Sequence, residues 1–118
     1  MTITRELLSG STNGRPINVS ATATPGTLVH TASSTSGQKD ELYLWVSNTT
    51  GTAATLTLEW GGVTDPDDLL VKAYSVPANS GPLLIANGLT LAGGVVARAF
   101  SGTANALNVT GYVNRIAI

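Results

Sequence analysis

The stretch that decides the fold is Asp40–Gly62, DELYLWVSNTTGTAATLTLEWGG. It contains two runs in which apolar residues occupy every second position, on either side of a link made of Asn, Thr, Gly and Ala. An alternation with a period of two is typical of strands that rest one face on a core. The residues that share the predicted inner faces are Leu42, Leu44 and Val46 in Glu41–Asn48, and Leu56, Leu58 and Trp60 in Ala54–Gly61. We therefore expect these aliphatic residues to form the centre of the core, with Trp60 closing one end of it.

The link between the two runs is short and contains Gly51, which favours a hairpin over a longer crossover. The sequence thus predicts that the two strands are neighbours in one sheet. Tyr43 and Trp45 fall on the opposite side of the first strand from its aliphatic residues. Either they form an outward aromatic patch of the kind found at interfaces, or the strand is central and buried on both faces. The pattern alone leaves both interpretations open.

The rest of the chain repeats this pattern, with short alternating runs about ten residues apart separated by Gly, Pro, Asn and Ser. Such spacing predicts an all-β fold, a single antiparallel β-sandwich of about eight strands with a jelly-roll-like arrangement. The eight expected strands are Arg15–Thr22, Thr27–Ala32, Glu41–Asn48, Ala54–Gly61, Leu69–Val76, Pro82–Ala86, Val95–Phe100 and Ala106–Ile116. Within the last of them, Gly111 indicates a bulge or a close approach of two backbones.

The first 14 residues do not fit this scheme and are expected to be a flexible arm before a sandwich domain over residues 15–118. Only Thr4–Leu8 could begin a helix, and that segment is too short to hold without tertiary support. Ile3, Leu7 and Leu8 belong to no expected strand. Apolar residues on such an arm can become ordered on a partner, so these three are candidate interface residues.

The composition of the 118 residues restricts the possible partners. Only 11% of the residues are charged, against about 25% in an ordinary soluble domain, and six Lys and Arg balance seven Asp and Glu. There is no basic field to hold a phosphate backbone, so we expect no nucleic-acid partner. A weakly charged surface does little to prevent self-association, so this composition indicates that the protein belongs to an assembly of subunits. The chain has no long apolar run, so we expect a soluble protein made in the cytoplasm, without a membrane partner.

Few residues suit chemistry. A single histidine, His30, and no cysteine make zinc binding unfavourable, and no Gly-x-Ser-x-Gly turn accompanies the histidine. His30 is therefore expected to be a strand residue that is exposed or hydrogen-bonded to a neighbour. The cluster Asp65, Asp67 and Asp68 includes Pro66 and fits a turn better than a calcium loop. We expect no catalytic, metal or cofactor-binding residues.

Arg98 shares one side of its strand with Val96 and Phe100. An arginine in such a place more often extends past the strand edge or pairs with a carboxylate than serves as a catalytic group. Arg98 completes the set of candidate interface residues, which are Ile3, Leu7, Leu8, Tyr43, Trp45 and Arg98.

Four segments, taken in order, carry a resemblance to a known family: GRPINVSATATPGTLVHTA, LTLEWGG, DPDDLL and VVARAFSGTANALNVTGYVNRI. This order of parts resembles the capsid decoration, or cement, proteins of tailed bacteriophages. The resemblance covers most of the chain from Gly14 onward and carries over no individual functional residue. It implies a virion structural protein on the capsid surface, with the major capsid protein as partner, and a homotrimer that locks neighbouring capsomers together.

Two other classes remain as alternatives. A carbohydrate- or receptor-binding module of a phage tail or fibre would use the same sandwich, with Tyr43, Trp45 or Tyr74 stacked on sugar rings. An enzyme is the weakest alternative and would depend on His30.

Overall fold

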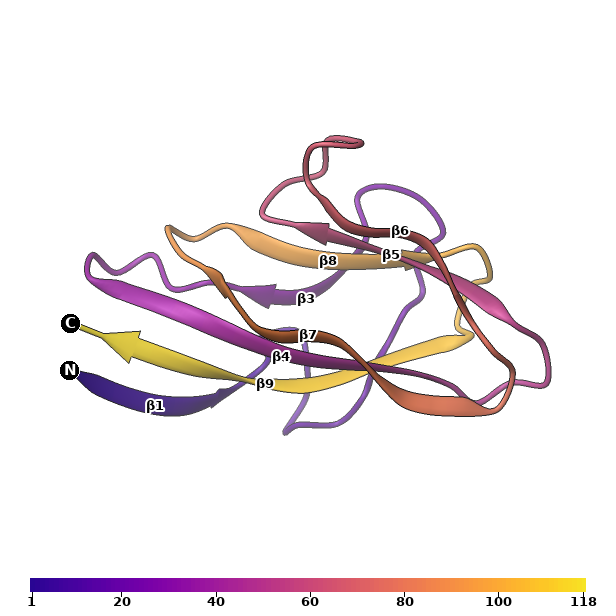
Figure 1. The fold of residues 1–118 in the computed structure, drawn as a ribbon, viewed down its shortest axis with the longest axis horizontal. Coiled ribbons are helices and arrows are strands. Elements are labelled where there is room, and N and C mark those ends of the chain that lie inside the picture. The colour runs from indigo at the N-terminus through magenta and orange to yellow at the C-terminus, as the bar shows by residue number, and fades with distance from the viewer.

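The computed structural model describes all 118 residues, and they form two antiparallel sheets that pack face to face (Figure 1). Sheet A has the strand order β1-β9-β4-β7, with β2 also paired to β9, and sheet B has the order β3-β8-β5-β6. The structure contains no helix that is long and apolar enough to cross a membrane. The strands are β1 (Thr2–Leu7), β2 (Ile17–Asn18), β3 (Thr27–Thr31), β4 (Gln38–Asn48), β5 (Ala54–Trp60), β6 (Leu69–Val76), β7 (Ser80–Leu91), β8 (Val96–Ser101) and β9 (Leu107–Ala117).

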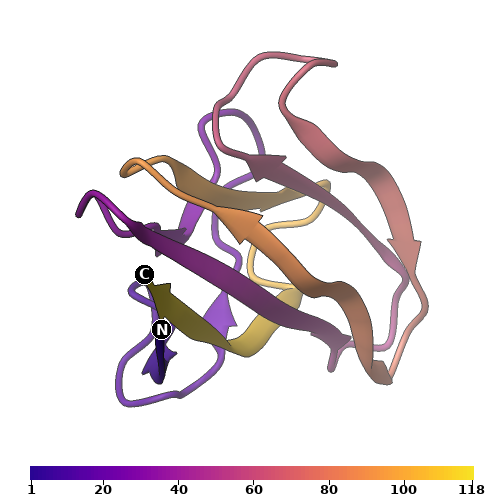
Figure 2. The same cartoon turned by 60° about the vertical axis from the view of Figure 1, so that its left-hand side comes forward.

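The pairing of the strands is that of a jelly roll. The first half of the chain pairs with the second half in reverse order, as β2 with β9, β3 with β8, β4 with β7 and β5 with β6. This long double hairpin is rolled so that β4 also pairs with β9, and β5 with β8 (Figure 2). The all-β sandwich predicted from the sequence is confirmed. β1 lies outside the eight rolled strands and is added to the edge of β9.

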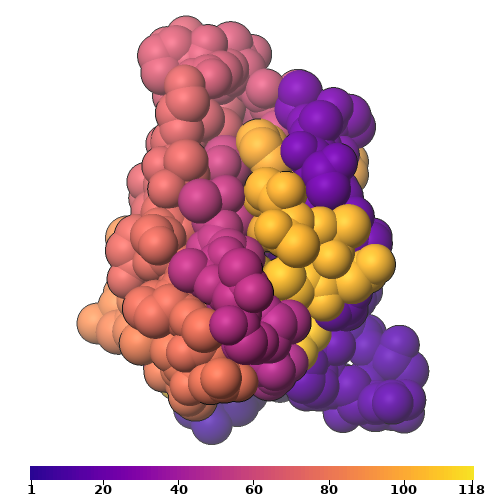
Figure 3. All heavy atoms as spheres, turned by 90° about the vertical axis from the view of Figure 1, so that its right-hand side faces the viewer, coloured from indigo at the N-terminus to yellow at the C-terminus, as the bar shows by residue number.

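The expected hairpin of the Asp40–Gly62 stretch is wrong, because β4 belongs to sheet A and β5 to sheet B. The link after Asn48 carries the chain from one sheet to the other. The buried Asn48 side chain fixes this passage by donating hydrogen bonds to the carbonyl oxygens of Thr52 and Val76. Figure 3 shows the magenta link against the orange β6–β7 turn, where the Asn79 N–H donates to the Thr50 carbonyl oxygen.

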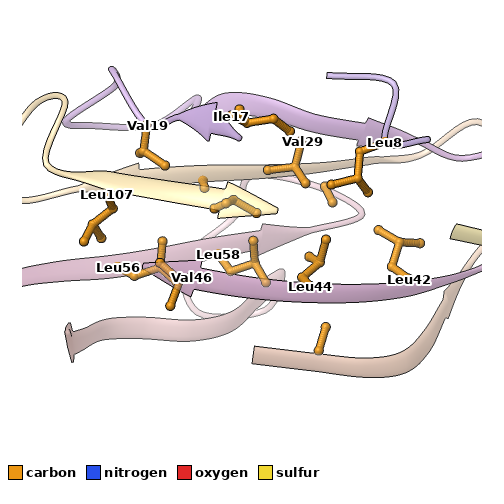
Figure 4. Packing of buried hydrophobic residues seen from close by; sticks show 14 of the residues in the cluster. Leu8, Ile17, Val19, Val29, Leu42, Leu44, Val46, Leu56, Leu58 and Leu107 are labelled. Carbon is orange, nitrogen blue, oxygen red and sulfur yellow. The ribbon is translucent and has the colours of Figure 1, made fainter. Parts of the chain in front are cut away.

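The core lies between the sheets, and its centre consists of the residues expected from the sequence (Figure 4). The inner faces of β4 and β5 meet across the sandwich instead of lying side by side, and Trp60 packs partly buried against this core. Burying one such aliphatic side chain contributes about 1.5–3 kcal/mol. The fully buried apolar residues from the two strands are Leu42, Leu44, Val46, Leu56 and Leu58.

The N-terminal segment differs from the expected flexible arm. Residues 2–7 form β1, which pairs with β9 from Thr2 opposite Ala117 to Leu7 opposite Tyr112. The next residue, Leu8, is only 2% exposed and belongs to the core, where Figure 4 shows it pointing inward beside Val29. A strand forms here because β2 pairs with only two residues of β9 and leaves the rest of that edge to be satisfied. The segment Thr4–Leu8 is therefore not the start of a helix.

Two other expected strands have different lengths. Of the expected strand Arg15–Thr22, only Ile17–Asn18 forms a strand, although Val19 and Ala21 also make backbone hydrogen bonds to Leu107 and Ser101. β7 is longer than the expected Pro82–Ala86 and contains Gly81 and Gly88, both with positive φ. Its pairing with β4 shifts register three times, so this strand bends along its length.

Gly111 marks a close backbone approach and not a bulge. It lies opposite Leu44 in a ladder between β4 and β9 that has no register shift. A Cβ atom at this position would be 1.9 Å from the carbonyl oxygen of Tyr43, far inside van der Waals contact. A side chain on Gly111 would therefore push the two central strands of sheet A apart.

Gly111→Ala is expected to lower the free energy of unfolding by about 1–3 kcal/mol, because the added methyl group cannot be accommodated without moving backbone. Urea denaturation measures the change. Gly51→Ala is the matched control, since nothing lies within 4 Å of a Cβ at that position. Equal urea midpoints for the two variants would contradict the close approach.

Candidate interaction face

The outer side of sheet A, which faces away from sheet B, carries most of the candidate interface residues. The pairing register places its side chains in rows that run across the strands. One row contains Leu7, Tyr112, Tyr43 and Asn87, and the next contains Thr110, Trp45 and Leu84. On the other side of the first row come Arg5, Asn114, Glu41 and Thr90, and then Ile3, Ile116 and Lys39.

We call five residues in the first two rows the aromatic face: Leu7, Tyr43, Trp45, Leu84 and Tyr112. The rings of Tyr43 and Tyr112 are stacked, with centroids 4.9 Å apart and planes inclined by 15°. Trp45 is tilted against Tyr112 at 6.1 Å. The guanidinium carbon of Arg5 lies 4.3 Å from the centroid of Tyr112 and comes from β1, on the other side of β9 from Tyr43. The Tyr112 ring is thus contacted from both sides.

The two interpretations of Tyr43 and Trp45 are each correct in part. β4 is a central strand of sheet A, yet no other layer covers its outer side, and both residues are half-buried by their neighbours on the same face. Tyr112 and Leu84 were missed as members of the face. The sequence places Tyr112 on the polar side of its strand, but only the register shows that it lies opposite Tyr43.

The remaining predicted interface residues divide into three groups. Ile3 and Leu7 are 55% and 56% exposed and extend the face onto β1. Leu8 is a core residue, so its predicted place at an interface is wrong. Arg98 lies on sheet B and donates a 3.4 Å hydrogen bond to the carbonyl oxygen of Gly26, away from the aromatic face.

A buried polar network holds β1 and the following residues in place. Asp40 is fully buried and accepts hydrogen bonds from the Ser33 N–H at 3.1 Å and from Arg115 Nε and Nη2 at 2.8 and 3.0 Å. His30 Nε2 lies 2.8 Å from the same carboxylate. The Ser9 N–H donates a hydrogen bond to His30 Nδ1 at 3.0 Å. In the neutral ring Nε2 therefore carries the hydrogen and donates a hydrogen bond to the Asp40 carboxylate.

This network joins both sheets to the N-terminal segment. His30 comes from β3 of sheet B, Asp40 and Arg115 from β4 and β9 of sheet A, and Arg115 also lies 3.6 Å from Glu6 of β1. Burial raises the pKa of the Asp40 carboxyl, but the hydrogen bonds from Arg115, His30 and Ser33 outweigh burial and hold this pKa below its ordinary value. The hydrogen bond to Asp40 raises the pKa of Arg115.

His30 is hydrogen-bonded to its neighbours, as the sequence predicted. Its arrangement differs from that of a nucleophile and base, because Nδ1 accepts from a backbone N–H and the ring is buried. The Ser9 hydroxyl accepts from the Thr31 N–H at 2.7 Å and makes no hydrogen bond with the imidazole. These contacts describe a structural link between segments.

The outer side of sheet B is covered at its centre by a loop of this chain. Glu59 is fully buried there and accepts hydrogen bonds from the Thr24 hydroxyl at 2.5 Å and the Gly26 N–H at 2.7 Å. Arg98 lies opposite Glu59 in the β5–β8 ladder and bonds the same loop. The loop between β2 and β3 is therefore held on this side, whereas the aromatic face on sheet A has no such cover.

The aspartate cluster forms a turn. Asp68 accepts from the Thr64 N–H at 3.0 Å, and Asp65 makes an exposed ion pair with Lys72 at 2.8 Å. No group of three or more His, Cys, Asp or Glu side chains is assembled to hold a metal ion. Two surface hollows of about 360 and 250 Å³ lie elsewhere, the first beside Arg15 and the second beside Arg98.

No protein-family model, no curated protein and no solved structure matches this chain.

Proposed function

We propose that the protein is a virion structural protein, a capsid decoration or cement protein that binds the outer surface of a phage head. In this proposal its partner is the major capsid protein, and bound copies stabilise the contacts between neighbouring capsomers. The observation that carries the proposal is the aromatic face, which is uncovered on a molecule with few charges.

The arrangement of this face supports a protein partner. Interfaces between proteins are enriched in Tyr and Trp at their centre, depleted of charge there, and surrounded by a polar rim. Here the centre is made of two tyrosines, a tryptophan and two leucines, and Lys39 and Glu41 lie in the outer rows. The one charge at the centre is that of Arg5, whose guanidinium lies over the Tyr112 ring. A partner that covered the face would therefore bury apolar area first and meet few charges.

The alternative of carbohydrate binding has less support. Stacking on a sugar requires an aromatic ring with a free face, and the Tyr112 ring is contacted by Arg5 and Tyr43 from its two sides. Tyr74, a candidate for the same role, lies on β6 of sheet B and is separate from Tyr43 and Trp45. Tyr43, Trp45 and Tyr112 thus form a packed cluster and not a row of open platforms.

Trp45→Ala is expected to weaken binding to phage heads about 30-fold, which corresponds to losing one interface residue worth about 2 kcal/mol. The measurement is cosedimentation of the purified protein with heads stripped of it. Tyr74→Ala is the matched control, an exposed aromatic residue on the other sheet, and should bind normally. Equal affinities for the two variants would remove the aromatic face from the proposal.

The same binding should change little when salt is raised to about 0.5 M, where the Debye length is roughly 4–5 Å. The reason is that ion pairs, which salt screens, are few on this protein.

Heads carrying the protein should also rupture at a higher temperature than stripped heads, because a ligand of the assembled state stabilises that state. Unchanged rupture temperatures would contradict the cementing role, and a steep loss of binding with salt would contradict the apolar mechanism.

A further inference from the structure

β1 is paired on one side only. Its backbone bonds β9, and no strand lies along its other edge (Figure 1). Five of the six residues of β1 are exposed and Glu6 is half-buried, so neither face of this strand is covered. Its neighbours Met1 and Ile118 are each 88% exposed, which adds apolar surface at this end of the molecule.

The edge of β1 is also the most regular one that this chain offers. Natural sandwiches protect exposed edges with bulges, prolines and inward charges, because an unbroken edge pairs readily with another strand. The edge strands β3, β6 and β7 each have at least one register shift against their neighbour, and β7 also contains Pro82. β1 pairs with β9 over six residues without a shift and has neither Pro nor Gly.

We propose that β1 pairs antiparallel with β1 of a second copy, so that a two-fold axis joins the two A sheets into one continuous sheet. A two-fold contact uses the same strand from both copies and closes on itself. A three-fold ring built by strand pairing would instead require β1 to pair with a different edge, and those edges are interrupted. This proposal is argued from the β1 edge and not from the proposed binding to phage heads, although Leu7 belongs to both surfaces.

The charges on β1 exclude two registers of the pairing. In an antiparallel pair, residues directly opposite each other share a face, and like charges in such positions are destabilising. A pairing centred on Arg5 or on Glu6 would set that residue opposite itself. A pairing centred on Thr4 sets Ile3 opposite Arg5, Thr2 opposite Glu6 and Met1 opposite Leu7, and it opposes no like charges.

The register centred on Thr4 also covers exposed apolar side chains. Ile3 of one copy would lie diagonal to Ile3 and Leu7 of the other, within the distance at which diagonal neighbours on a sheet interact. Met1, Ile3 and Leu7 are all more than half exposed in the single chain. The pairing thus adds apolar contacts to the backbone hydrogen bonds, as strand addition does in other complexes.

The first test compares two charges at one position by analytical ultracentrifugation over a range of protein concentrations. Ile3→Lys places a cation opposite Arg5 of the other copy and should weaken the dimer about tenfold, whereas Ile3→Glu places an anion there and should not weaken it. A merely apolar patch would lose affinity equally with either charge. Because Ile3 is 55% exposed, circular dichroism should show both variants folded.

The second test uses the absence of cysteine in this chain. Thr4 lies on the two-fold axis of the proposed register, directly opposite Thr4 of the other copy. The variant Thr4→Cys should therefore give a disulfide-linked dimer under mild oxidation, because directly opposed Cβ atoms are close enough for the bond. Thr2→Cys is the control, because in this register Thr2 lies opposite Glu6 of the other copy. The two introduced cysteines would therefore be several residues apart along the paired strands. Equal cross-linking of the two variants would overturn the register.

Three results would overturn the dimer itself. These are a monomer at every concentration, the homotrimer that the family resemblance implies, or a dimer that Ile3→Lys leaves intact and Leu84→Lys breaks. The last result would place the contact on the aromatic face and away from the β1 edge.

Discussion

Deletion of residues 1–8 is expected to destabilise the sandwich strongly. Truncating one buried leucine alone costs about 2–5 kcal/mol, and this deletion should cost more. The deletion removes Leu8 from the core, exposes the edge of β9 over Tyr112–Ala117 and removes Glu6 from beside Arg115. Since a whole domain is stable by only about 5–15 kcal/mol, this change should leave much of the protein unfolded at 37 °C. Urea and thermal denaturation followed by circular dichroism measure it.

A shorter deletion serves as the matched control. Removal of residues 1–6 takes away most of β1 but keeps Leu8 and the Ser9 N–H that donates to His30. Because the residues it removes are mostly exposed, it should cost much less than the longer deletion. If both deletions leave the urea midpoint unchanged, residues 1–8 are an appendage and not part of the fold.

The N-terminal strand shows why sequence patterns fail for some elements. Alternation reveals a strand clearly when one of its faces is buried, but β1 is exposed on both sides and Arg5 interrupts the alternation between Ile3 and Leu7. Leu8 is held in the core by long-range bonds of the residues that follow it, because the Ser9 N–H donates to His30 and the Gly10 N–H to the Val29 carbonyl oxygen, about 20 residues away in the chain. No local signal separates this leucine from the exposed Leu7 beside it.

The Asp40–Gly62 stretch shows what local patterns do and do not determine. The alternation predicted which residues are inside, and Leu42, Leu44, Leu56 and Leu58 are all fully buried. It did not predict which strands pair, because a short polar link can either turn back within one sheet or pass to the other. The side chain of Asn48 decides between them by bonding the carbonyl of Val76, a residue 28 positions further on.

The aromatic face was predictable only in part for the same reason. Tyr43 and Trp45 stand out within their own strand, whereas Tyr112 becomes a neighbour of both only through the β4–β9 register. That register joins residues almost 70 positions apart in the chain. The kinds of residue on the face can therefore be taken from the sequence, but their arrangement cannot.

Asp40→Ala is expected to lower the free energy of unfolding by about 3–5 kcal/mol, the usual cost of removing one partner from a buried ion pair. The change leaves Arg115 Nε and Nη2, His30 Nε2 and the Ser33 N–H without their common acceptor. Asp67→Asn is the control, because this carboxylate is exposed and makes no hydrogen bond, and it should stay within about 0.5 kcal/mol of the native chain.

The stability of the protein should also depend on the charge of Asp40 in acid. The pKa of this carboxyl is lower in the folded chain than its ordinary value of 3.8, so the folded state binds the proton less well than the unfolded state does. The stability it contributes is present above pH 3.8 and is lost as the pH falls through the folded value. Urea midpoints measured through this range should fall more steeply for the native chain than for Asp40→Asn, whose amide does not titrate. Coincident profiles, or a loss below about 1 kcal/mol for Asp40→Ala, would show that Arg115 and His30 find other partners and that this network does not hold the two sheets together.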